Sequence, residues 1–156
     1  MMDTIDMFKY SRAATIIALG NADEKDLDVQ PEGYPNTLRW NAGHIYSTAE
    51  EFLHKADHSY EISNPKWFDY FIDGTRPSEW PEEGVPSIEE IIEALKEQEK
   101  KIENHFKGKL DQPASEDHVI RTINLDSADA ALQFCLWHEG IHLGVIKSLL
   151  IAVKQD

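Results

Sequence analysis

The sequence contains a single cysteine, Cys135, among its 156 residues. One thiol cannot form a disulfide within the chain, and it cannot supply a thiolate-rich zinc site. Free thiols persist most readily in a reducing compartment. We therefore expect a cytoplasmic protein whose fold depends on a hydrophobic core and not on covalent cross-links.

Basic residues are scarce. The chain has 15 lysines and arginines against 29 aspartates and glutamates, which gives a formal net charge of −14. Nucleic acids and anionic lipid surfaces are bound by basic patches. We therefore expect no nucleic acid and no membrane among its partners, and a small-molecule substrate suits this composition better.

Long hydrophobic runs are missing as well. The longest apolar stretches, 13–19 and 149–153, are far shorter than the roughly 20 residues that a membrane-spanning helix needs. Acidic residues occupy the N-terminal segment, where a signal peptide would be basic. We expect neither a membrane span nor an export signal. The length suits a single domain covering residues 1–156.

Four segments have apolar residues at spacings of three and four, the pattern of amphipathic helices. They run from about Asp3 to Leu19, from near Asn36 to Ala56, from Ser87 to Gly108, and from Asp126 or Ser127 to about Val153. Nothing between them predicts a convincing sheet. The expected fold is all-α, a four-helix bundle with long connections between helices 2 and 3 and between helices 3 and 4.

Both long connections have local features. The first, residues 64–86, is rich in proline, glycine and aromatic residues, and we expect one helical turn around 67–71. The second contains Pro113 and a β-favouring stretch, residues 119–123. The third helix has a clear start, because Ser87 and Glu90 form a capping box.

His138 and His142 are four residues apart in the last helix, so both side chains can reach one metal ion. The spacing alone leaves two interpretations open, metal ligands or core histidines paired with carboxylates or carbonyls. A third ligand would decide between them. His44 is the best candidate, because it lies beside the apolar stripe of the second helix. The other histidines lie in polar helix ends or connections: His54, His58, His105 and His118.

The segment from His138 to His142 also matches HExxH, the zinc-protease motif in which the glutamate is the general base. A catalytic zinc normally has three protein ligands. Too little chain follows His142 to supply the third ligand, and Gly140 inside the motif weakens the helix. We therefore do not favour a protease.

Three segments together resemble the DinB-like superfamily: Pro31-Glu32-Gly33, residues 36–45 (NTLRWNAGHI) and residues 137–146 (WHEGIHLGVI). The resemblance lies in the order and spacing of a W-x-x-G-H segment and an H-x-x-x-H segment, and it spans essentially the whole chain. It implies a four-helix bundle in up-down-down-up order. It also implies that His44, His138 and His142 bind zinc, nickel or a similar divalent metal ion.

Three neutral imidazoles would leave one coordination position open, as in catalytic zinc sites. Water bound there would have a pKa near about 7, and a small thiol would become a thiolate. Trp40 and Trp137 are candidate pocket walls, and Glu139 and Glu51 are candidate acceptors for ligand N–H groups. Packing and solvation are the competing roles for these four residues, and Cys135 is better explained as a small buried hydrophobe.

The superfamily includes transferases and isomerases that use mycothiol or bacillithiol, beside members without known activity. We therefore expect a metal-dependent thiol S-transferase or a related detoxification or stress-response enzyme. Two alternatives stay open, a non-catalytic stress-associated metal-binding protein and a metal-dependent hydrolase. An exposed bundle face would also allow a homodimer. The metal, the thiol and the substrate do not follow from the sequence.

Overall fold

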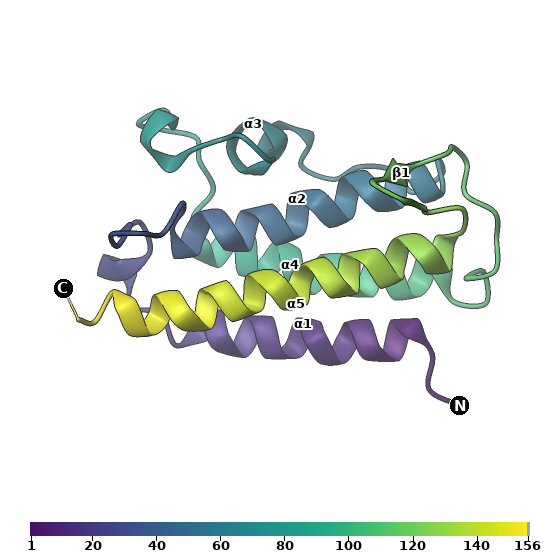
Figure 1. Ribbon diagram of the computed structural model, residues 1–156, viewed down its shortest axis with the longest axis horizontal. Helices are drawn as coiled ribbons and strands as arrows, with labels where there is room; N and C mark the ends of the chain where they lie inside the picture. The colour runs from purple at the N-terminus through teal and green to yellow at the C-terminus, as the bar shows by residue number, and fades with distance from the viewer. Residues whose placement is uncertain (156) are drawn as a thin grey trace.

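The computed structural model describes residues 1–155, and most of them are helical. Four long helices lie side by side (Figure 1): α1 (Thr4–Gly20), α2 (Leu38–Ala56), α4 (Ile88–Phe106) and α5 (Ala128–Ala152). In both views α1 and α5 run in one direction, and α2 and α4 run in the other. The prediction of an all-α fold class is confirmed in this broad sense.

Side-chain caps define where the helices begin. Asp3 caps α1, and the predicted capping box of Ser87 and Glu90 caps α4. Ser127 caps α5 through the N–H of Ala130. The α2 helix begins slightly later than predicted, because Thr37 and not Asn36 accepts the first free N–H. These oxygens satisfy N–H groups that have no partner within the helix.

The interior contains two apolar clusters at opposite ends of the bundle. One cluster includes Leu19, Leu38, Ile91 and Leu149, and the other includes Phe8, Leu53, Ile102 and Leu132. Buried polar side chains occupy the level between them: Arg12, Glu50, Gln98 and Glu139. The middle of the bundle therefore differs in chemistry from both of its ends.

Short elements fill the connections. The connection between α1 and α2 contains η1 (Glu24–Asp26). The segment between α2 and α4 contains η2 (Pro65–Trp67), α3 (Phe68–Phe71) and η3 (Pro77–Glu79). The α3 helix lies against α2, outside the four long helices (Figure 1).

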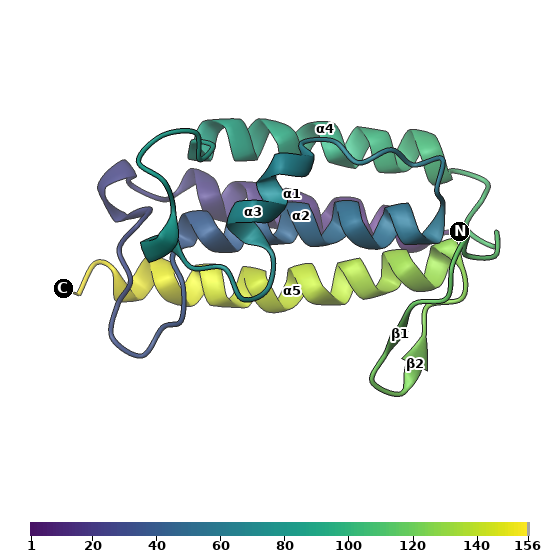
Figure 2. The same cartoon turned by 90° about the horizontal axis from the view of Figure 1, so that it is seen from above.

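Between α4 and α5 a hairpin projects from the bundle (Figure 2). It consists of β1 (Val119–Ile120) and β2 (Ile123–Asn124), which pair antiparallel. We expected no convincing sheet, and this small hairpin corrects that expectation; it lies at the stretch 119–123 that the sequence marked as β-favouring. Strands of two residues are too short to show the alternation by which a strand is predicted.

Within residues 1–155, α5 alone is long and apolar enough to cross a membrane, judged by length and composition only. The core helix of a bundle can meet the same criterion. Here α5 contacts both α1 and α2, and 22% of its most apolar window is buried within the bundle. The absence of a membrane partner therefore stays an expectation.

Candidate metal centre

Three histidines from two helices converge between α2 and α5. His44, His138 and His142 each offer a ring nitrogen, and these nitrogens all lie within 4.8 Å of one another. The Nε2 atoms of His44 and His138 are 3.0 Å apart. His138 and His142 are one turn apart on α5, so both face α2.

His44 is fixed by contacts on two sides. Its Nδ1–H donates to the carbonyl oxygen of Phe71, at 2.6 Å. The Trp40 ring stacks on the imidazole, with ring centroids 4.5 Å apart and an angle of 13° between the planes. Because Nδ1 carries the proton in this arrangement, the lone pair lies on Nε2, which points at the other two histidines.

Gly43 allows the approach that orients His44. A Cβ atom at this position would lie 2.4 Å from ring atoms of Phe71, far inside van der Waals contact. Only glycine lets α3 come so close to α2, and the carbonyl of Phe71 thereby reaches His44. The glycine within the predicted helix thus has a packing reason next to the site.

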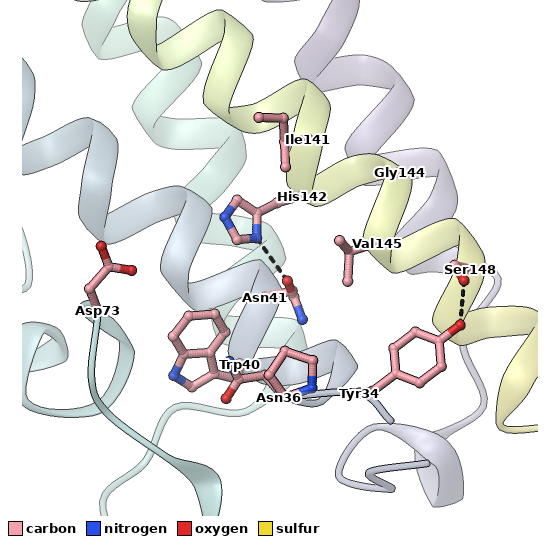
Figure 3. Close-up of a pocket in the computed structure, with 11 residues that line it drawn as sticks. Tyr34, Asn36, Trp40, Asn41, Asp73, Ile141, His142, Gly144, Val145 and Ser148 are labelled. Atoms are coloured by element: carbon pink, nitrogen blue, oxygen red, sulfur yellow. Dashed lines mark hydrogen bonds between the residues drawn. The ribbon is translucent and has the colours of Figure 1, made fainter. Parts of the chain in front are cut away.

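His142 is fixed by an asparagine that sequence reasoning missed. Its Nδ1 lies 2.8 Å from Oδ1 of Asn41 (Figure 3). The amide nitrogen of Asn41 donates to the carbonyl of Thr37, at 2.8 Å, so its oxygen must accept from His142. The lone pair of His142 therefore lies on Nε2. Asn41 is one turn before His44 on α2, and that spacing was the available signal.

Burial keeps the three imidazoles neutral. It lowers the pKa of His138 to about 4 and that of His142 to about 3. Burial also lowers the pKa of His44, although the hydrogen bond to Phe71 and the charge of Asp73 oppose the shift. At neutral pH all three rings are therefore in the form that binds metal ions.

A cavity of about 550 Å³ adjoins His142 between the N-terminal part of α2 and the C-terminal half of α5 (Figure 3). Asp73, on the segment after α3, faces the cavity from one side. Tyr34 and Ser148 hydrogen-bond to each other at the other side. Its remaining walls include Asn36, Trp40, Asn41, Ile141 and Val145.

A sequence model described as the DinB superfamily matches residues 7–146. The chain belongs to the DinB superfamily. The matched range contains α2, the three histidines and most of α5. A comparison with curated proteins finds no match.

In this DinB-superfamily chain, Glu139 does not contact the histidine cluster. Its side chain is 1% exposed and pairs with Arg12 at 2.9 and 3.0 Å. Successive helical residues point about 100° apart, so Glu139 faces the bundle interior while His138 faces α2. Glu51 forms an ion pair with Lys55 at 3.0 Å. The structure brings neither carboxylate to the ligand N–H groups.

The two tryptophans differ in position. Trp40 stacks on His44, whereas Trp137 is 60% exposed and lines a separate cavity beside the β1–β2 hairpin. Cys135 is buried, and burial raises its thiol pKa well above the usual range. It is therefore a thiol and not a thiolate ligand at neutral pH.

The histidines outside the DinB-superfamily cluster have contacts of their own. His54 lies 2.9 Å from the carbonyl of Tyr60, and His58 pairs with Glu116 at 2.7 Å. His105 pairs with Asp57 at 2.8 Å, and His118 packs edge-on against Phe52. Within residues 1–155, the three convergent histidines form the one cluster suited to holding a metal ion.

Proposed function

We propose that this protein binds one divalent metal ion through Nε2 atoms of His44, His138 and His142. The observation that carries the proposal is the convergence of three neutral imidazoles. For His44 and His142, a hydrogen bond at Nδ1 also leaves the Nε2 lone pair toward the cluster. Oriented neutral imidazoles suit zinc and nickel. We place the site in a bundle of the up-down-down-up order implied by the family.

We further propose that the metal serves catalysis. Three imidazoles without thiolates are the donor set of open catalytic sites, whereas closed structural zinc sites normally have four protein ligands, often cysteines. When bound, a divalent ion supplies a Lewis acid that lowers the pKa of a thiol or water. Asn41 and the carbonyl of Phe71 hold two imidazoles in place, and Trp40 shields one face of His44 from water.

The reaction that we place first is thiol S-transfer to a small electrophile. The family resemblance favours it, and the cavity beside His142 offers room for a small molecule. In such a transfer the thiol gives up its proton, its sulfur forms a bond to an electrophilic carbon, and the leaving group departs with the bonding electron pair. A metal-dependent hydrolase and a non-catalytic metal-binding protein are the outcomes against which this proposal is tested.

Elemental analysis of protein purified without a histidine tag tests metal binding. We expect about one zinc or nickel per wild-type chain, and loss of the metal in His44→Ala and in His142→Ala. His58→Ala is the matched control, because His58 pairs with Glu116 away from the cluster. Circular dichroism checks that each variant folds. Full metal retention by both cluster variants would exclude the three-histidine site.

A turnover screen tests the reaction. Metal-loaded protein is incubated with electrophiles in the presence of bacillithiol, mycothiol or glutathione, and separately with esters, amides and phosphate esters without a thiol. Thiol-dependent turnover that disappears in His142→Ala is the expected result. Turnover without thiol would favour the hydrolase. Metal binding with no turnover in either arm would favour the non-catalytic protein.

A further inference from the structure

Asp73 stands in a tight turn directly after α3. The N–H of Thr75 donates to the carbonyl of Ile72 at 3.1 Å, and Gly74 has a φ of +90°. The Thr75 hydroxyl also accepts a hydrogen bond from the Trp40 indole at 2.9 Å. Because Trp40 stacks on His44, the turn that carries Asp73 is attached to the histidine cluster.

The carboxylate of Asp73 approaches Nε2 of His44, the ring nitrogen that points toward the other two histidines. Oδ1 of Asp73 lies 3.7 Å from Nε2 of His44, while Nδ1 of that ring is bonded to Phe71. Two ligand atoms on a tetrahedral ion with bonds of about 2.1 Å lie roughly 3.4 Å apart. The observed separation is somewhat longer than that value, and Asp73 lies outside the set of ligand atoms that are all within 4.8 Å of one another.

Among residues 1–155, the one ion pair of the Asp73 carboxylate is with His44. The Asp73 side chain is 98% exposed, and among residues 1–155 it forms no ion pair with a lysine or arginine. It faces His142 across the cavity in Figure 3. The chain has a net charge of −14, so a carboxylate at this place is stabilised by a nearby cation.

We propose that Asp73 is a fourth ligand of the metal ion, which gives a set of three imidazoles and one carboxylate. This inference rests on the proposed metal site and adds a residue from outside the two helices that hold the histidines. Because the turn after α3 lies at the surface, Asp73 and not a histidine would be the ligand that an incoming substrate displaces from a bound metal ion. The carboxylate also reduces the net charge of a divalent site to +1.

Loading with Co²⁺, whose visible absorption reports its ligands, tests this assignment. We expect Asp73→Ala to change the Co²⁺ spectrum and to weaken Co²⁺ binding at least tenfold in competition with a chelator. Azide, as a small probe anion, should change the spectrum of Asp73→Ala at a concentration at least tenfold below that needed for wild type. Asp69→Ala is the matched control, an exposed aspartate on the same α3 segment.

The outcomes separate the two proposals. A wild-type chain that binds no Co²⁺ would overturn the metal site and the role of Asp73 together. A wild-type chain that binds Co²⁺, with an Asp73→Ala spectrum and azide response equal to those of Asp69→Ala, would overturn the fourth ligand alone. Weaker binding with an unchanged spectrum would also overturn it, because the carboxylate would then act only through its charge.

Discussion

His138 and Glu139 are adjacent in α5, yet they belong to two polar groups of opposite character, one partly buried and one fully buried. His138 faces α2 and meets two other imidazoles, and one ring nitrogen of each lies within 4.8 Å of the others. Glu139 faces the interior and meets Arg12, which pairs with both of its carboxylate oxygens. The histidine cluster brings neutral ring nitrogens together, whereas in the interior network the Arg12 guanidinium is paired with the Glu139 carboxylate. The difference separates a ligand site from a structural network.

The interior network extends across all four long helices. Arg12 on α1 donates to Glu139 on α5 and also to the carbonyl of Leu95 and the side chain of Gln98 on α4. Gln98 donates in turn to Glu50 on α2, at 2.9 Å. This network lies between the two apolar clusters and joins all four long helices by hydrogen bonds.

Removing a charge from the network should have the largest effect. In Glu139→Ala the guanidinium of Arg12 stays buried without its carboxylate, and breaking a buried pair in this way costs about 3–5 kcal/mol. Urea unfolding measures the change in the free energy of unfolding. Glu51→Ala is the control, because its pair with Lys55 lies at the surface and contributes about 1 kcal/mol or less. Equal losses in both variants would contradict a structural role for Glu139.

Removing an imidazole should reduce the stabilisation by metal much more than it reduces the stability of the metal-free fold. We expect His142→Ala to unfold much like wild type when both are metal-free, because the ring is only partly buried. Added Zn²⁺ at one hundred times its dissociation constant should stabilise wild type by about 2.7 kcal/mol. The variant should show almost none of this gain. Thermal unfolding with and without Zn²⁺ measures both quantities, and an undiminished gain in His142→Ala would count against ligation.

Asn41 belongs to the bundle interior by its burial and to the histidine cluster by its contact with His142. It is buried, but its oxygen serves His142 and not another core residue. Loss of such a partner typically weakens metal affinity by about 10–100-fold. We expect this loss in Asn41→Ala, measured by chelator competition, together with a folded α2. Gln133→Ala is the control, because Gln133 is an exposed amide on α5 that bonds only to Asp129.

The helices could be predicted because their signals are local. Apolar spacing and caps such as Ser87 act within a few residues. The β1–β2 hairpin was indicated only by the β-favouring composition of residues 119–123, since strands of two residues carry no usable period. The direction of Glu139 was open to prediction from helical geometry. The HExxH motif would place the glutamate beside the metal as a general base, whereas Glu139 pairs with Arg12 in the bundle interior.

The metal site could be predicted only in part, because several of its contacts join segments that are far apart in the sequence. The spacing of His138 and His142 is visible within one helix, whereas His44 needed the family resemblance. The contact from Phe71 is a backbone carbonyl, which any residue type supplies. Asp73 lies 29 residues after His44 in the sequence. Its place depends on Gly43 admitting α3, a packing event that no local pattern encodes.

Acid should destabilise the metal-free protein through the histidine cluster. In the metal-free protein, burial lowers the pKa of His138 to about 4 and that of His142 to about 3, against 6.5 as the ordinary value. As pH falls below about 6.5, the unfolded chain takes up protons that the folded chain does not, so the folded state loses stability. The loss continues toward pH 4.

A double variant isolates this contribution. Urea unfolding of metal-free wild type and of His138→Ala/His142→Ala is compared at several pH values between 7 and 4. The difference between the two free energies of unfolding should move against wild type as pH falls, because groups shared by both proteins cancel. Two such groups give a slope of at most about 2.7 kcal/mol per pH unit, and the partial exposure of both rings reduces it. A difference that does not change with pH would mean that the imidazoles are not held neutral by burial.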